Sequence, residues 1–206
     1  MSDFNRTIQP DILAFAENIL DSKQLELAEQ LSDDLLSNEE DRQHAILHLR
    51  EIMGTSPKRP IYYLEHEIGG LPEYSTRHVV RYAGDYIDQM IKYCSYDKGD
   101  FLIWKTRGLH KSLGQNLNRL KDILPKDLID MLTKFNEIIY VPAKHTWDIP
   151  EDRDHLFSSK EAVYICLMVK NLSALIGPYS EFCVSYNKNE QVHYYYDSSQ
   201  KGRRNE

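Results

Sequence analysis

The sequence predicts an all-α protein, folded as a bundle of about seven or eight helices. Apolar residues recur at helical spacing through most of the 206 residues, and they make up 41% of the chain, which is enough for a packed core. Glycine and proline residues separate these segments and indicate where each helix starts and stops. Residues 162–176 are apolar on nearly every side, so we expect this helix at the centre of the bundle.

The first quarter of the chain predicts three helices. The first runs from Pro10 to Leu20, with apolar residues on one face. Ser22 is the expected N-cap of the second. Ser37 and Glu40 have the spacing of a capping box for the third, which should end at Met53 before a glycine.

The middle of the chain predicts further helices. Pro60 lies in the first turn of a short helix that stops at residues 69–70, and residues 75–76 start a long one. A continuous helix is expected over residues 103–124, after which Pro125 restarts the chain into another helix.

The last third contains the predicted central helix. A polar loop is expected over residues 141–157, and Ser158 and Glu161 then form a second capping box. Beyond the central helix, residues 182–186 and 191–196 have the pattern of a short C-terminal β-hairpin, or of an aromatic tail packed on the bundle.

Charge divides the chain unequally. Residues 1–56 hold 12 acids and 4 bases, a net charge of −8, whereas residues 57–206 hold 20 acids and 21 bases, a net charge of +1. We therefore expect an acidic helical segment over residues 1–56 within the same domain, a main bundle over residues 57–196 and a flexible tail over residues 197–206.

Several classes of protein are disfavoured by what the sequence lacks. It has no apolar run of about 20 residues, so we expect no membrane partner. It has no glycine-rich phosphate loop, no Gly-x-Ser-x-Gly motif and no paired cysteines with zinc-finger spacing, so we expect no cofactor and no bound metal. Two of the three cysteines lie in apolar segments, which favours the reducing cytoplasm; Cys166 is too apolar in its surroundings to be a nucleophile.

The clearest charged feature is the stretch from Trp104 to Lys121, which contains basic residues and no acid. On a helical wheel, most of its cations lie apart from its leucines. A surface that carries only positive charge is suited to phosphates or to an acidic protein. We therefore expect RNA, more than DNA, or an acidic protein surface as partner. A solvated helix face, or burial beneath the acidic N-terminal segment, is the alternative. The expected binding residues are Lys105, Arg107, His110, Lys111, Arg119 and Lys121.

Residues 144–155 form a second candidate, because they carry two histidines and four carboxylates ahead of a capped helix. His145, Arg153 and His155 are the expected catalytic residues if this loop is an active site, with His145 as a general base. His145, Asp148 and His155 could instead bind a metal, although their spacing matches no named metal signature. The simplest alternative is a solvated connection between helices.

A third candidate lies in the acidic segment. His44 and His48 are four residues apart, a spacing compatible with metal binding on one helix face. Arg42 precedes His48, and Arg59 precedes His66, with five and six residues between them. This spacing in a helical protein resembles that of the HEPN superfamily of defence and toxin ribonucleases, and the resemblance implies a metal-independent ribonuclease with Arg42 and His48 in its active site.

These patterns together favour a non-enzymatic binding or regulatory protein, which contacts its partner through the basic residues between positions 104 and 121. The HEPN-like ribonuclease is the alternative enzyme hypothesis. A structural subunit of a larger complex, docked through its acidic segment, is the third hypothesis.

Overall fold

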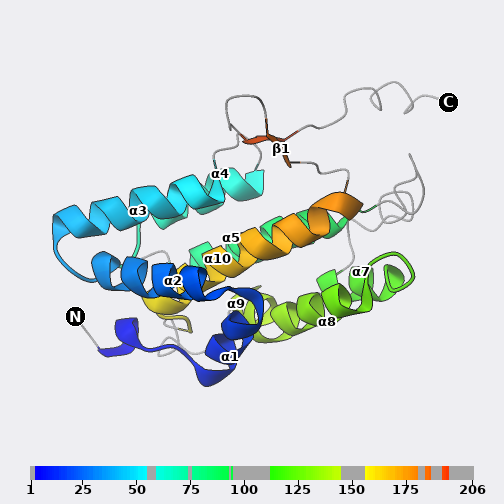
Figure 1. Ribbon diagram of the computed structural model, residues 1–206, viewed down its shortest axis with the longest axis horizontal. Coiled ribbons are helices and arrows are strands. Elements are labelled where there is room, and N and C mark those ends of the chain that lie inside the picture. Colours follow the sequence, from blue (N-terminus) through cyan, green and yellow to red (C-terminus); the bar gives the residue numbers. More distant parts are fainter. Residues whose placement is uncertain are drawn as a thin grey trace.

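The predicted helical bundle is confirmed by a computed structural model (Figure 1). The structure describes residues 3–54, 59–73, 76–92, 94, 112–144, 156–180, 184–186 and 192–194. The first half of the chain forms α1 (Pro10–Ile19), α2 (Ser22–Leu35), α3 (Glu39–Met53), α4 (Arg59–Ile68) and α5 (Thr76–Lys92). The second half forms α7 (Leu113–Arg119), α8 (Lys126–Phe135), a π-helix (Asn136–Tyr140), α9 (Val141–Lys144) and α10 (Ser159–Ile176).

The predicted central helix is α10. It runs through the middle of the molecule beside α5, and it also packs against α1, α2 and α3 (Figure 1). Every side chain from Glu161 to Val169 is buried, as are Leu172 and Ile176 nearer its end, whereas Leu175 is exposed. The predicted capping box is present, because Ser158 accepts the amide of Glu161 and the Glu161 carboxylate accepts the amide of Ser158.

One stretch of the described chain, Ser159–Tyr179, is long and apolar enough to span a membrane. Its mean hydropathy is 1.3, and 61% of that stretch is buried inside the protein. The apolar surface of α10 is therefore used for contacts with neighbouring helices.

Two predicted N-caps are wrong by one residue. Asp21, not Ser22, caps α2, and it exchanges hydrogen bonds with Gln24 in a capping box. Asn38, not Ser37, caps α3 and accepts the amides of the second and third helical residues. In both places two adjacent residues are good caps, and the local pattern does not discriminate between them.

The predicted continuous helix over residues 103–124 is also wrong. Ser112 has extended backbone angles, φ −66° and ψ 157°, and it caps a new helix through a capping box with Gln115. That helix, α7, ends at Arg119, and Lys121 lies in the turn that follows. Residues 103–111 lie outside the described residues.

The predicted loop over residues 141–157 begins too early, because helical structure continues to Lys144. The π-helix over residues 136–140 precedes Pro142, which has no amide to donate to the carbonyl of residue 138. A locally widened helix accommodates such a missing bond, so the proline does not end the helix here.

The core is continuous across the two predicted segments. One cluster of buried apolar side chains includes Ile46 and Leu49 of the acidic segment together with Ile87 and Ile165 of the main bundle. Strands β1 (Val184–Tyr186) and β2 (Val192–Tyr194) pair antiparallel. The turn between them and the tail over residues 197–206 lie outside the described residues, so the hairpin and the flexible tail stay predictions.

Candidate nucleic-acid interface

The predicted basic surface falls largely outside the described residues. Lys105, Arg107, His110 and Lys111 belong to that undescribed part. Arg119 and Lys121 are described and exposed, but they lie on either side of the end of α7. The break at Ser112 means that these six residues do not share one straight helix, so their joint role stays a prediction.

The predicted catalytic loop is also largely outside the described part, because His145, Arg153 and His155 belong to it. Its first residue, Lys144, ends α9. The Lys144 ammonium donates to the hydroxyl of Tyr140 at 3.1 Å and lies 4.9 Å from the centre of that ring.

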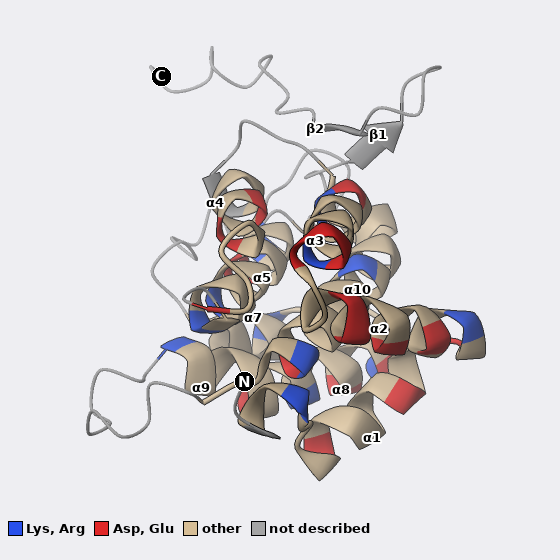
Figure 2. Ribbon diagram, turned by 90° about the vertical axis from the view of Figure 1, so that its left-hand side faces the viewer, with Lys and Arg blue, Asp and Glu red and all other residues tan. Residues whose placement is uncertain are grey.

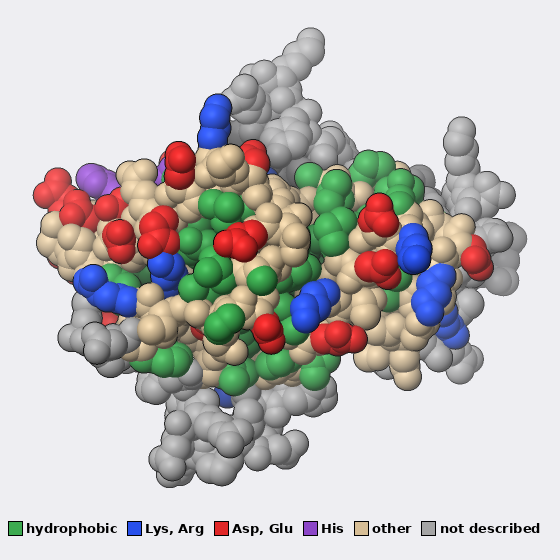
Figure 3. Space-filling model, turned by 60° about the horizontal axis from the view of Figure 1, so that its bottom comes forward, with side chains coloured by type: hydrophobic (Ala, Val, Ile, Leu, Met, Phe, Trp, Pro, Cys, Tyr) green, Lys and Arg blue, Asp and Glu red, His purple; other side chains and the backbone are tan. Residues whose placement is uncertain are grey.

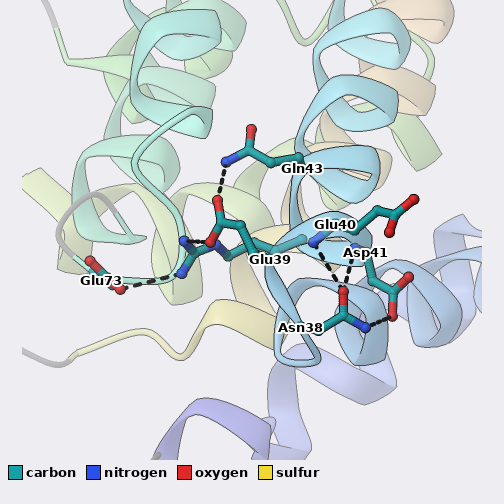
Figure 4. A network of polar contacts seen from close by, with 7 residues as sticks. Asn38, Glu39, Glu40, Asp41, Gln43 and Glu73 are labelled. Atoms are coloured by element: carbon teal, nitrogen blue, oxygen red, sulfur yellow. Dashed lines mark hydrogen bonds and ion pairs between the residues drawn. The ribbon is translucent and has the colours of Figure 1, made fainter.

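At the alternative active site, Arg42 is already engaged by two glutamates, which Figure 4 shows within a network of polar contacts. Arg42 forms ion pairs with Glu39, one turn earlier in α3, and with Glu73, at 3.3 Å. Gln43 donates to the same Glu39 carboxylate at 2.8 Å. This network ties the start of α3 to the segment that follows α4.

Arg42 and His48 do not converge. Six residues along an α-helix turn the direction of the side chain to about 120° away and advance it by about 9 Å. Arg42 is directed to Glu39 and Glu73, whereas His48 is exposed. The paired active site that the HEPN resemblance implies is therefore not assembled at these positions; the side chain of Arg59 is outside the described residues, so its pairing with His66 stays a prediction.

Acidic residues dominate one side of the molecule. Figure 2 shows them along α2 and α3, and Figure 3 shows acids across a neighbouring face of the molecule, with cations among them. A surface of this sign repels nucleic acid, so an anionic partner must bind elsewhere. The exposed acids of α2, its cap and α3 are Asp21, Glu26, Glu29, Asp33, Glu39, Glu40 and Glu51.

Helices α4 and α5 present a different surface, which combines aromatic and basic side chains. Tyr62 and Tyr63 of α4 are 53% and 41% exposed. The Tyr63 ring stacks on Tyr82 of α5 with centroids 5.3 Å apart, and Tyr62 meets Tyr63 edge-on at 5.6 Å. His78 lies edge-on to Tyr82 at 6.4 Å. We call Tyr62, Tyr63, His78, Arg81 and Tyr82 the aromatic–basic face.

The local sequence explains why these side chains point outward. In α4, the buried residues Ile61, Leu64 and Ile68 place the two tyrosines on the other side of the helix. In α5, the buried pair Val79 and Val80 leaves the flanking residues on the outer side. Along α5, Arg77 and His78 precede this buried pair, and Arg81 and Tyr82 follow it. The helical wheel would have revealed this face, had aromatic residues been counted with the cations.

The basic side chains of this face are only loosely paired. The Arg81 Nε atom lies 3.9 Å from a carboxylate oxygen of Asp85, beyond hydrogen-bond distance, and it has no hydrogen-bond partner among the described residues. His78 lies 3.6 Å from Glu67. The guanidinium of Arg81 therefore retains capacity for a further acceptor.

Asp85 links this face to the π-helix. It accepts the Tyr140 hydroxyl at 2.7 Å, and burial, together with the nearby carboxylates Asp88 and Asp85, raises the pKa of Tyr140, so that the phenol stays protonated. Gly84 allows this contact, because a Cβ there would lie 2.1 Å from the Tyr140 ring. Asp88, one turn further, pairs with Lys92 at 2.6 Å, and burial raises its pKa.

Other chemistries find little support in the described residues. No group of three histidine, cysteine, aspartate or glutamate side chains within them could hold a metal ion, and so His44 and His48 have no third ligand there. Burial raises the pKa of the Cys94 and Cys166 thiols to about 12, which disfavours a thiolate nucleophile.

Comparison with protein-family models, with curated proteins and with solved structures found no significant match.

Proposed function

We propose that this is a non-enzymatic binding protein that contacts RNA, more than DNA, through the aromatic–basic face. The supporting observation is the exposed pair Tyr62 and Tyr63, of which Tyr63 stacks on Tyr82, the neighbour of Arg81 in α5. Exposed aromatic rings stack on unpaired bases, and arginine binds phosphate with two donors. Single-stranded RNA offers both groups, whereas the bases of a duplex are closed to stacking.

The distribution of charge supports the same proposal. The chain is acidic overall, with a net charge of −7, but its acids concentrate on α2 and α3. The first 56 residues account for that excess, and the remainder is close to neutral. An RNA strand is thus repelled from the side that α2 and α3 form, whereas the cations and carboxylates of α4 and α5 are equal in number. Arg119 and Lys121, both exposed, could extend the contact, together with the predicted basic residues at positions 105–111.

The test is binding of a labelled single-stranded RNA of mixed sequence, followed by fluorescence anisotropy. We expect the double substitution Tyr62→Ala with Tyr63→Ala to weaken binding by about tenfold or more, because each stacked base contributes roughly 1–3 kcal/mol. Tyr62→Phe with Tyr63→Phe keeps both rings and should bind as the native chain does. Affinity should fall as salt rises from about 50 to about 200 mM.

Leu47→Ala is the matched control, because Leu47 of α3 is 52% exposed and lies on the acidic side. It should leave RNA affinity unchanged. Equal affinity of the native chain and the double alanine variant would overturn the proposal. So would binding of duplex and single-stranded RNA with the same affinity.

Material that copurifies with the chain distinguishes the other partners. Nucleic acid supports the proposal, whereas a second protein indicates an acidic partner surface or a larger complex. We place the protein in the cytoplasm, where the buried thiols Cys94 and Cys166 would remain reduced. Cleavage of labelled RNA in the presence of a chelator, abolished by His48→Ala or His145→Ala, would instead identify a ribonuclease.

A further inference from the structure

Asp85 occupies the position from which an anion would reach the cations of this surface. It lies one helical turn beyond Arg81 and Tyr82 on α5, with 28% of its side chain exposed. One carboxylate oxygen faces Arg81 at 3.9 Å, and the other accepts the Tyr140 hydroxyl at 2.7 Å. The carboxylate thus lies between the aromatic–basic face and the π-helix.

Through Tyr140, Asp85 also influences Lys144. The Tyr140 oxygen accepts from the Lys144 ammonium at 3.1 Å while its proton is donated to Asp85. The Tyr140 hydroxyl thus connects Lys144 to Asp85 through two hydrogen bonds, whereas the ion pair that Asp85 itself forms is with Arg81. The ring that carries this link is held in place, because it packs directly on the backbone at Gly84 and is only 2% exposed.

The ion pair between Asp85 and Arg81 is weak enough for another anion to replace the Asp85 carboxylate. At 3.9 Å it is an ion pair without a hydrogen bond, and the buried Nε atom of Arg81 has no acceptor in the described part of the chain. A phosphate accepts from two guanidinium nitrogens at once and carries its own negative charge, so it is the stronger partner.

We propose that Asp85 competes with RNA phosphates for Arg81 and so lowers the affinity of the chain for RNA. This inference rests on the proposed RNA-binding function and concerns the regulation of that same surface. A phosphate that binds Arg81 replaces the carboxylate as its partner. Without the Asp85 charge, Arg81 does not have to give up this carboxylate partner before it binds the phosphate.

Asp88 provides a matched control on the same helix. It lies three residues from Asp85, but it is 5% exposed, and its partner is Lys92 rather than Arg81. The substitutions Asp85→Asn and Asp88→Asn therefore make the same chemical change at an exposed and at a buried position. Only the first removes a charge that RNA would meet.

The experiment measures affinity for single-stranded RNA at several salt concentrations. Asp85→Asn should bind about three- to fivefold more tightly than the native chain at low salt, since an exposed ion pair contributes modestly. Asp88→Asn should match the native chain. In a background that already carries Arg81→Ala, the Asp85→Asn gain should disappear. Equal or weaker binding by Asp85→Asn would show that the carboxylate does not compete, and the inference would be wrong.

A second probe separates this inference from the proposed function. Inorganic pyrophosphate contacts cations without any stacked base, and its binding is followed as a rise in melting temperature. If the native chain binds no RNA, the proposed function fails. The competition still stands if Asp85→Asn binds pyrophosphate more tightly than both Asp88→Asn and the native chain, and it is overturned if all three bind alike.

Discussion

Helices α10 and α5 lie side by side in the middle of the bundle, yet they carry their polar groups very differently. In α10, the buried charged residue is Glu161 at the N-terminal end, where its carboxylate accepts the amides of Gln9 and Ser158. In α5, a buried carboxylate, Asp88, lies within the helix and leaves one oxygen without a hydrogen-bond partner among the described residues.

This contrast separates a helix whose buried carboxylate has both oxygens hydrogen-bonded from a helix whose buried carboxylate, within the described residues, does not. Buried polar groups cost free energy unless every hydrogen bond is made, and α10 meets that requirement at Glu161. Along α5, the charged residues Arg81, Asp85, Asp88 and Lys92 form one row between the aromatic–basic face and the π-helix. Buried groups without a hydrogen-bond partner are uncommon, and Asp88 is one of them in the part of the chain that the structure describes, whereas the candidate interface lies on the outer side of α5, at Arg81 and Tyr82.

The largest effect should come from the core of α10. Leu172→Ala removes a side chain with 0% exposure, and we expect a loss of about 2–5 kcal/mol in the free energy of unfolding, measured by urea denaturation. Leu175→Ala, three residues later, removes a side chain that is 46% exposed and should change stability by less than about 0.5 kcal/mol. Equal effects at both positions would contradict the central placement of α10.

A smaller effect is expected where α5 meets the π-helix. Gly84→Ala places a Cβ where the Tyr140 ring lies, so we expect a loss of roughly 1–3 kcal/mol despite the better helix propensity of alanine. Gly177→Ala is the matched control, because nothing lies within 4 Å of its added Cβ. If Gly84→Ala stabilised the chain, as alanine does in an open helix, the close packing of Tyr140 on α5 would be refuted.

The sequence was sufficient to predict most of the bundle, because its helix boundaries depend on local chemistry. Pro10, Gly54 and the Ser158–Glu161 capping box act within one turn, and each lies where the pattern places it. The break at Ser112 was missed for a physical reason. Leucines continue at helical spacing across it, and that spacing records which side chains are apolar, not whether the backbone between them stays helical.

The candidate interface was harder to predict, because it joins residues from two helices. Charge alone led to the stretch between Trp104 and Lys121, and no role was assigned to Tyr62 and Tyr63 from the sequence. Their exposure depends on how α4 packs against α5, which is a tertiary property. Likewise, the six-residue spacing of Arg42 and His48 suggested an active site, although ion pairs with two glutamates already account for the arginine.

The smallest effect is a change in how stability depends on pH. Burial raises the pKa of Asp88 in the folded state, so the folded protein holds this proton more tightly than the unfolded chain does. Its contribution to stability is therefore fully present below the unfolded pKa and is lost as pH rises through the folded pKa. Asp88→Asn has no such proton to lose.

Thermal unfolding of the native chain and of Asp88→Asn, followed from acidic to neutral pH, measures this difference. We expect the variant to gain stability relative to the native chain as pH rises. Glu161→Gln does not provide the same comparison, because the Glu161 carboxylate accepts two backbone amides that the variant would partly lose. A stability difference between Asp88→Asn and the native chain that stays constant across this pH range would mean that Lys92 fully compensates the buried charge. In that case α5, like α10, would have its buried polar groups satisfied.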